Sequence, residues 1–333
     1  MQAETSNPPA GEPSQAAVVA LRQQLAQAIV GQAALLDRLV IALLTGGHLL
    51  VEGLPGLAKT TAVKALAGAV HAGFQRIQFT PDLLPGDLTG TDAYLPATGE
   101  MRFVPGPLFH DIVLADEINR APAKVQSALL EAMQERQVTV GGVTRALPPL
   151  FLVMATQNPL EQSGTYPLPE AQLDRFLLHV ALDYPKADEE LRILDMDLQR
   201  HADGHPALAR QVLAMDAAAV LQARHAVRRI HLAPILRHYI VELVRATRDP
   251  GAHVPRLAGM VEAGGSPRAV LALAHAAQAL AYLRGREFVL PDDIIELAPD
   301  VLRHRIVLAL EADLQGVSAD ALIADLLQAI PVP

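Results

Sequence analysis

The fourteen residues from His48 to Thr61, HLLVEGLPGLAKTT, constrain the fold of this chain more than any other stretch. The apolar residues 49–51 predict a short buried strand, which is followed by a loop that contains two glycines and a proline. Lys59 and Thr60 then stand at the start of a helical pattern. A strand, a glycine-bearing loop, Lys-Thr and a helix follow one another in this order in a phosphate-binding P-loop.

The chemistry of such a loop comes from the start of its helix. Backbone N–H groups in the first helical turn have no partner within the helix, and the helix dipole adds partial positive charge there. We expect Lys59 to reach the outer phosphates of a nucleotide and the hydroxyl of Thr60 to bind Mg²⁺. The residues expected to surround the phosphates are Gly53, Pro55, Gly56, Leu57, Ala58, Lys59, Thr60 and Thr61.

The loop departs at one position from the usual pattern, G-x-x-x-x-G-K-[ST]. Gly53 and Lys59 have the required spacing, but Ala58 replaces the second glycine. Alanine suits this position if its backbone has ordinary helical dihedrals, because only a positive φ demands glycine. Gly56 is available for the sharper part of the turn. On this stretch alone, a Gly-Pro turn with an incidental lysine remains an alternative.

Composition limits the class of protein. The chain has 333 residues, enough for about two domains. A net charge of −9 argues against a general nucleic-acid binder, and the absence of cysteine excludes disulfides and thiol catalysis. No apolar run approaches the ~18 residues of a membrane-spanning helix. The first residues resemble no secretory signal, so we expect a disordered tail over 1–13 and a cytoplasmic location.

Four near-continuous apolar runs and one run that alternates apolar and polar residues, FQRIQF, predict the strands of a parallel sheet that is covered by helices on both faces. We therefore predict an α/β fold with a P-loop αβα sandwich over residues 14–185. From Tyr184-Pro185 onward the pattern is helical throughout, which predicts an all-α lid domain over 186–333. The predicted strands cover 49–51, 74–79, 112–115, 150–155 and 177–182.

Two insertions interrupt the first domain. The first contains a turn at Thr98-Gly99, which is flanked by residues 91–94 and 100–103. The second contains a turn at Gly141-Gly142, which is flanked by residues 137–140 and 143–145. Each pair of segments predicts a β-hairpin.

The third predicted strand ends in two carboxylates. Asp116 follows four apolar residues at the carboxyl end of that strand, where open α/β sheets bind their ligands, and Glu117 comes next. We expect Asp116 to hold Mg²⁺ and Glu117 to activate the attacking water of a phosphoryl hydrolysis. An ordinary surface Asp-Glu pair is the alternative, but the pair lies downstream of a P-loop, and this favours the catalytic interpretation.

Three further polar residues are weaker candidates. Asn158 follows the fourth strand, which can lie between the first and third strands, so its amide could hold the water or the γ-phosphate. The alternative for Asn158 is an asparagine that forms a turn before a proline. Arg175 precedes the fifth strand. Arg268 follows Ser266-Pro267 at a helix start, from where it could reach back over the nucleotide. A surface ion pair and plain solvation are the alternatives for these two arginines.

Five motifs, taken in order, carry a resemblance. GLPGLAKT, VLADEINRAP, ATQNP, LPEAQLDRF and GGSPRA resemble those of AAA+ ATPases of the MoxR family, in the helix-2 insert clade, and the resemblance covers about residues 15 to 330. An alanine at position 58 is usual in that family's loop. The resemblance implies a five-stranded nucleotide domain, a helical lid, and ATP with Mg²⁺ bound between them.

The resemblance also implies roles for single residues. Asn158 matches sensor 1, Arg175 the arginine finger that acts on the ATP of a neighbouring subunit, and Arg268 sensor 2. Gly31 and Gln32 match the segment near the adenine. Walker A is implied at Lys59 and Thr60, and Walker B at Asp116 and Glu117.

A finger that acts on a neighbour implies a homo-oligomer, and the resemblance suggests a hexameric ring. It further implies a chaperone or activator that remodels a client metalloenzyme, or inserts its metal or cofactor, together with a separate von Willebrand factor A domain protein. A magnesium-chelatase-like subunit is a close variant. A nucleic-acid-dependent motor and a nucleotide-switched scaffold without turnover are the alternatives. The acidic charge disfavours the motor, and Glu117 with Arg175 disfavours the scaffold.

Overall fold

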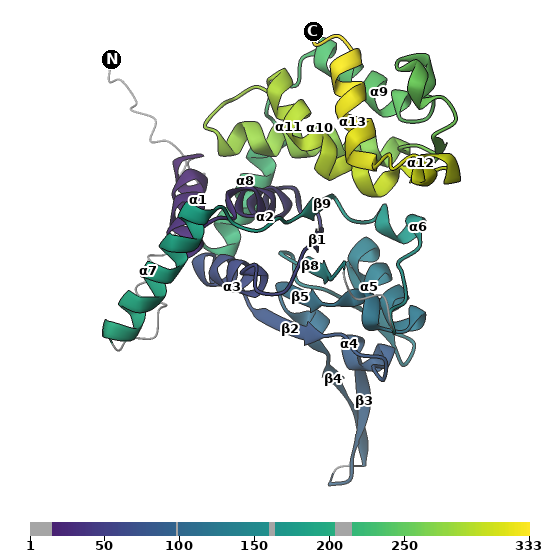
Figure 1. Cartoon of the computed structure of the whole chain (residues 1–333). Coiled ribbons are helices and arrows are strands. Elements are labelled where there is room, and N and C mark those ends of the chain that lie inside the picture. Colours follow the sequence, from purple (N-terminus) through teal and green to yellow (C-terminus); the bar gives the residue numbers. More distant parts are fainter. Residues whose placement is uncertain (1–14, 98, 160–163, 204–214) are drawn as a thin grey trace, which may run out of the picture.

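The computed structural model describes residues 15–97, 99–159, 164–203 and 215–333, and the side chains of 200–203 are not included in that description. The tail expected over 1–13 lies outside these residues. Five parallel strands form the central sheet in the order β2-β5-β8-β1-β9, which confirms the predicted sheet (Figure 1). These strands are β1 (Leu49–Glu52), β2 (Phe74–Gln78), β5 (Ile112–Asp116), β8 (Leu152–Gln157) and β9 (Leu178–Ala181).

Helices cover both faces of this sheet, as the apolar strands predict. Alternate strand residues, such as Leu49 and Val51, join one hydrophobic cluster with α1 (Gln15–Ala28), α2 (Ala33–Thr45) and α3 (Lys59–Ala69). The intervening residues face the other way. They pack with α4 (Pro85–Thr89), α5 (Ala123–Glu135) and the short turns η1 (Pro107–Phe109) and η2 (Ile118–Arg120). The αβα sandwich is therefore confirmed.

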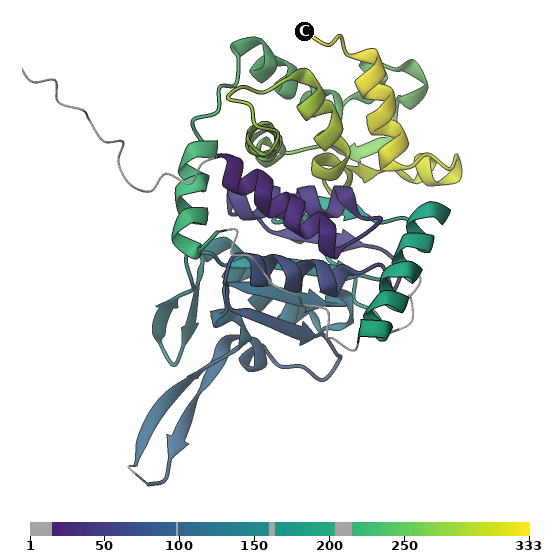
Figure 2. The same ribbon diagram turned by 90° about the vertical axis from the view of Figure 1, so that its left-hand side faces the viewer.

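The C-terminal part of the chain is mostly helical (Figures 1 and 2). It also contains a two-stranded antiparallel ribbon, so the prediction that everything after Pro185 is helical was wrong. The ribbon's strands are too short for an alternating pattern to be visible in the sequence. The strands are β10 (Val261–Ala263) and β11 (Val307–Leu308).

Helices α9 to α13 form a layer over α2 in Figure 1, and α10 packs against both α2 and α11. Their apolar residues belong to the same hydrophobic cluster as α1 to α3, so the core is continuous across the expected domain boundary near Pro185. That boundary stays a prediction. The helices are α6 (Glu170–Leu173), which still belongs to the sandwich, α7 (Ala187–Asp203), α8 (Ala217–Val227), α9 (Pro234–Ala246), α10 (Pro267–Leu283), α11 (Pro291–Leu302), α12 (Leu310–Leu314) and α13 (Ala319–Ala329), with the turns η3 (Pro250–Ala252), η4 (Pro255–Leu257) and η5 (Arg303–Arg305).

Both predicted hairpins are present, as β3 (Gly90–Leu95) with β4 (Glu100–Pro105) and β6 (Gln137–Val140) with β7 (Val143–Ala146). The first projects far from the sheet (Figure 2). Side chains join the two hairpins, because the Arg145 guanidinium lies 3.8 Å from the ring centre of Phe103 and 3.9 Å from the Asp92 carboxylate.

Within the described residues, the structure contains no helix that is long and apolar enough to cross a membrane.

Candidate nucleotide-binding site

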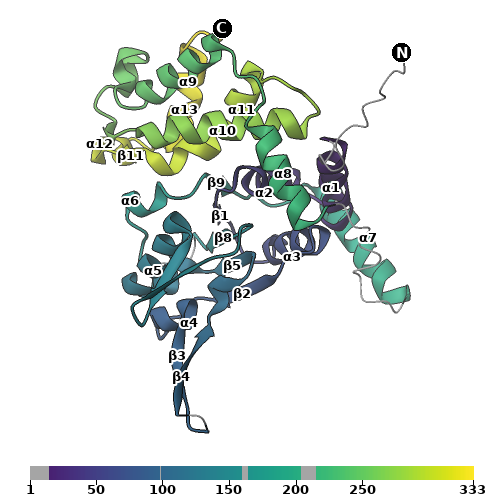
Figure 3. The same ribbon diagram turned by 180° about the vertical axis from the view of Figure 1, so that it is seen from behind.

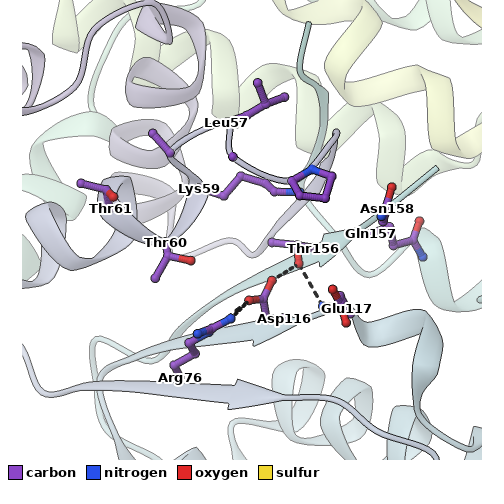
Figure 4. Close-up of a pocket in the computed structure, with 13 residues that line it drawn as sticks. Leu57, Lys59, Thr60, Thr61, Arg76, Asp116, Glu117, Thr156, Gln157 and Asn158 are labelled. Atoms are coloured by element: carbon purple, nitrogen blue, oxygen red, sulfur yellow. Dashed lines mark hydrogen bonds and ion pairs between the residues drawn. The ribbon is translucent and has the colours of Figure 1, made fainter. Parts of the chain in front are cut away.

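A cavity of about 370 Å³ opens at the carboxyl edge of the central strands, where the loop after β1 faces the ends of β5 and β8 (Figure 4). Parallel strands of an open α/β sheet present their ligands at this edge. The cavity brings together all of the P-loop residues from 55 to 61 with both predicted carboxylates and Asn158. Its lining residues are Pro55, Gly56, Leu57, Ala58, Lys59, Thr60, Thr61, Arg76, Asp116, Glu117, Thr156, Gln157 and Asn158.

The P-loop closes on itself through its lysine. The Lys59 ammonium donates a hydrogen bond to the carbonyl oxygen of Gly53 at 2.7 Å, so one end of the loop is tied to the other. Gly53 therefore belongs to the loop through its backbone, although it does not line the cavity. Burial lowers the pKa of the Lys59 ammonium, and the charges of Asp116 and Glu117 oppose that shift.

Ala58 does not meet the condition under which the sequence argument accepted alanine at this position. Its φ is +56°, in the left-handed region, so the expectation of ordinary helical dihedrals was wrong. The chain must turn sharply at this residue to start α3 at Lys59 with its N–H groups facing the cavity. Alanine has the smallest side chain after glycine, but a left-handed residue with a Cβ costs about 1–2 kcal/mol.

One threonine holds the two carboxylate residues in place. The Thr156 hydroxyl donates to Asp116 Oδ1 at 2.6 Å and accepts from the backbone N–H of Glu117 at 2.9 Å. Thr156 is 1% exposed and comes from β8, next to β5 in the sheet. Glu117 has a φ of +59°, which turns it out of the strand direction directly after Asp116. Left-handed non-glycine residues of this kind concentrate at functional sites.

Strand β2 contributes two residues that the sequence argument did not select. Arg76 donates to Asp116 Oδ2 from Nε at 3.0 Å and from Nη2 at 2.5 Å, and the Gln78 amide donates to Glu117 Oε2 at 2.7 Å. In the sequence they are the polar positions of FQRIQF, which indicate only the exposed side of an edge strand. Each contact joins residues about forty positions apart, so spacing alone could not have revealed them.

The donors in the cavity fit a magnesium nucleotide. Mg²⁺ in such sites takes a carboxylate, a hydroxyl, water and phosphate oxygens, and Asp116 with Thr60 can supply the two protein ligands. Bound there, the ion would neutralise charge on the phosphates. Lys59 and the N–H groups at the start of α3 supply positive potential at the same place.

Asn158 lies where the fourth predicted strand should deliver it. It follows β8, which lies between β1 and β5, and it is 8% exposed and faces the cavity (Figure 4). Its role as sensor 1 stays a prediction.

Gly31 and Gln32 do not line the cavity. Gln32 precedes the first residue of α2 without capping it through its side chain, and its side-chain amide donates to the carbonyl of Asp183 at 3.4 Å. Gly31 has a φ of +80°, and a Cβ there would lie 3.1 Å from Pro185 and 3.4 Å from Glu189. These two residues therefore border the chain that leads from β9 into α7. Their predicted place near an adenine stays a prediction.

Arg268 lies away from the P-loop of its own chain, which differs from the expected position over the nucleotide. It shares a second cavity of about 360 Å³ with Arg175, and no P-loop residue lines that cavity. The difference arises from the lid, whose packing on α2 directs the start of α10 toward α6, and no local sequence pattern reports such an orientation. Figure 3 shows α6 on the opposite side of the molecule from α7.

Asp174 organises this second cavity. Its carboxylate accepts from Arg305 Nε at 2.7 Å and from the Ser266 hydroxyl at 3.2 Å, and it lies 3.8 Å from Arg268 Nη1. The residue before Arg175 is thereby joined to the start of α10. Arg136 and Arg175 also line the cavity, so its lining holds four arginines and one carboxylate and carries net positive charge.

Comparison with known proteins agrees with this geometry. Residues 48–178 match the ATPase family associated with various cellular activities (AAA), and residues 255–326 match an AAA lid domain. Chaperone MoxR1 of Mycobacterium tuberculosis is 47% identical over 306 residues, which cover 92% of this chain and 79% of that protein. This chain belongs to the MoxR family of AAA+ ATPases.

Other members support the assignment. Protein MoxR of Methylorubrum extorquens is 32% identical over 303 residues, which cover 88% of each chain. The crystal structure of a candidate ATPase from Cytophaga hutchinsonii superposes with a TM-score of 0.87 at 42% identity and covers 96% of both chains. The predicted family and fold are therefore confirmed. The family match starts at His48, so it includes the P-loop, both carboxylates and Arg175.

Proposed function

We propose that this chain hydrolyses ATP as a ring-forming chaperone or activator of the MoxR type. One observation carries the proposal: Lys59, Thr60, Asp116 and Glu117 converge in one cavity, whereas Arg175 lies in another. The first cavity holds what phosphoryl hydrolysis requires, except for a cation that reaches the transferred phosphoryl group from outside.

Within one chain the roles divide by position. Lys59 and the start of α3 bind the phosphates, Thr60 and Asp116 bind Mg²⁺, and Glu117 orients the attacking water. The hydrogen bonds from Thr156 to Asp116 and from the Glu117 N–H to Thr156 fix the Asp116 carboxylate relative to the backbone of Glu117. Asn158, on the neighbouring strand end, is placed to hold the water or the γ-phosphate.

Arg175 and Arg268 complete the site of a second copy of the chain. Both line the positively charged cavity on the side of α6 and α10, and a triphosphate presented by a neighbour matches that charge. Because the acceptor cavity and the donor cavity differ, such a contact is head-to-tail. We propose that it closes into a ring of six subunits. An arginine supplied in this way is worth on the order of 10³ to 10⁵ in rate.

We propose a protein partner in preference to a nucleic acid. The large exposed apolar side chains of the projecting hairpin are Tyr94, Met101 and Val104, with exposed fractions of 61%, 63% and 49%. Arg145 is engaged with Phe103 and Asp92. Such a surface offers few cations to a phosphate backbone.

The proposed partners follow the family. One relative is called a chaperone, and two are called MoxR. We propose that this chain acts in the cytoplasm with a separate von Willebrand factor A domain protein on a client metalloenzyme. The exposed hairpin is the proposed contact for one of these proteins.

The test is the substitution Glu117→Gln. Because the amide cannot accept a proton from water, we expect turnover to fall by at least 10²-fold while ATP binding remains. The variant should also hold the oligomer together in ATP, as measured by size-exclusion chromatography with light scattering. An unchanged rate of phosphate release would exclude Glu117 as the base, and absence of ATP binding by the unmodified protein would refute the proposed function.

A further inference from the structure

Arg76 makes the closest charged contact in the nucleotide cavity. Two of its nitrogens, Nε and Nη2, donate to the same oxygen of Asp116, Oδ2, at 3.0 and 2.5 Å. The other oxygen, Oδ1, accepts from Thr156 at 2.6 Å. Both oxygens of the expected Mg²⁺ ligand are therefore engaged by the protein, and one of them is engaged by a cation.

The position of Arg76 is built into the sheet. Strand β2 pairs with β5 along its whole length, so Arg76 lies beside Leu114 and Gln78 lies beside Asp116. Arg76 Nη2 also donates to Gln78 Oε1 at 2.9 Å, which fixes the plane of the guanidinium. The side chain is nevertheless 48% exposed, and its charged end lines the cavity (Figure 4). It is held on one side and open toward the phosphate site on the other.

A guanidinium at this place has two electrostatic consequences of opposite sign. It carries the same charge sign as Mg²⁺ and contacts the same carboxylate oxygen, so it opposes binding of the metal. It carries the opposite sign to the phosphates, for which arginine offers five donors in a planar fork, so it favours the nucleotide. The Lys59 ammonium donates its hydrogen bond to the Gly53 carbonyl, so the direct contact with the Asp116 carboxylate is made by Arg76.

We propose that Arg76 is a built-in counter-charge of the nucleotide site. It occupies Asp116 when no divalent cation is bound there, and it supports the polyphosphate of a nucleotide that arrives without metal. The chain therefore binds ATP with a shallower dependence on Mg²⁺ than the same site would show without this arginine. The proposal rests on the proposed nucleotide site and assigns one more residue to it.

The substitution Arg76→Gln separates the two effects. Glutamine keeps an amide that can reach Gln78 but removes the charge from a half-exposed position. We expect the dissociation constant of a fluorescent ATP analogue, measured in EDTA, to rise about fivefold. We expect the Mg²⁺ concentration that gives half of the metal-induced binding to fall about fivefold, because Asp116 is no longer occupied. Neither measurement requires turnover.

Two control variants accompany this measurement. Lys64→Gln removes one exposed positive charge from α3 that does not line the cavity, so both constants should remain within about twofold of the unmodified protein. Arg76→Lys keeps the charge and should also remain close to the unmodified protein in EDTA. It would show that a loss in Arg76→Gln does not arise from damage to the strand.

The two constants also distinguish the possible failures. If both affinities fall in Arg76→Gln, the arginine only orients Asp116 for the metal, and the proposal is refuted while the nucleotide site stands. If neither changes, the ion pair has no role in binding and the proposal is equally refuted. If the unmodified protein binds no ATP, and Lys59→Ala changes nothing, the proposed function itself fails.

Discussion

His48 links the stability of this protein to pH. It precedes β1 and is 5% exposed. Its Nδ1 accepts a hydrogen bond from the backbone N–H of Val153 at 3.0 Å, and its Nε2 lies 3.1 Å from the carbonyl oxygen of Met133. Since Nδ1 accepts, Nε2 carries the proton, and the neutral ring joins β8 to α5. Burial lowers the pKa of His48 from 6.5 to about 3, and the charge of Arg136 adds to this shift.

The sign of the effect follows from proton counts. In the unfolded chain the histidine takes up a proton near its ordinary pKa of 6.5, whereas the folded chain keeps it neutral down to about 3. The unfolded state therefore binds more protons in this window, and the free energy of unfolding falls as the pH decreases. At about 1.4 kcal/mol per pH unit, His48 accounts for a loss of about 2 kcal/mol between about pH 7 and about pH 5.

A second buried histidine behaves in the same way. Burial, with the charge of Arg305 nearby, lowers the pKa of His304 well below 6.5, so this histidine adds a loss of stability of the same sign over that interval. The pKa of Glu52 is lowered below 4.5, chiefly by its hydrogen bond with His179. The stability that Glu52 contributes is lost only as the pH falls below 4.5. Glu52 therefore does not account for a loss of stability between about pH 7 and about pH 5.

The assay is urea unfolding at the two pH values for the unmodified protein and for His48→Gln. The variant should be less stable near pH 7, yet its loss on acidification should be about 2 kcal/mol smaller. His225→Gln, at an exposed position of α8, serves as the matched control and should retain the full loss. An equal loss in His48→Gln and in the unmodified protein would refute the reasoning.

Two further predictions concern the P-loop and the subunit contact. Because Ala58 has a left-handed backbone, Ala58→Gly should change the free energy of unfolding by no more than about 1 kcal/mol, whereas Ala58→Val should lower it by about 2 kcal/mol. Equal stability of the two variants in urea unfolding would contradict the positive φ of Ala58. Leu271, one turn after Arg268 and 58% exposed, should tolerate Leu271→Asp in the fold but lose the ATP-dependent oligomer in light scattering. Leu314→Asp, at a 78% exposed position of α12, should keep that oligomer, and loss of assembly in both variants would remove the argument for this face.

The parts of the fold that were predictable are those with a local physical signature. Leu49 to Val51 and the runs before Asp116 and Asn158 are apolar because the sheet buries them on both faces, and their polar ends meet because parallel strands share a carboxyl edge. The P-loop and the two acidic residues therefore followed from pattern and spacing.

The remaining features depend on contacts between distant segments. Arg76 finds Asp116 only once β2 pairs with β5, and Thr156 meets Asp116 only because β8 is the next strand. Arg268 was expected over its own P-loop, but the packing of α10 on α2 places it beside Arg175. Residues with a Cβ disfavour the left-handed backbone conformation that Ala58 adopts, and the turn into α3 imposes it.

Whether two chains share one catalytic site is tested most directly by mixing two inactive variants. Lys59→Ala removes the phosphate-binding lysine and keeps Arg175, whereas Arg175→Ala does the reverse. In a random equal mixture about one quarter of the head-to-tail contacts combine an intact P-loop with an intact arginine. We predict ATP turnover of about a quarter of that of the unmodified protein, although each variant alone is inactive. If no mixing ratio restores turnover, Arg175 does not act on the neighbouring P-loop, and the account of a shared site is wrong.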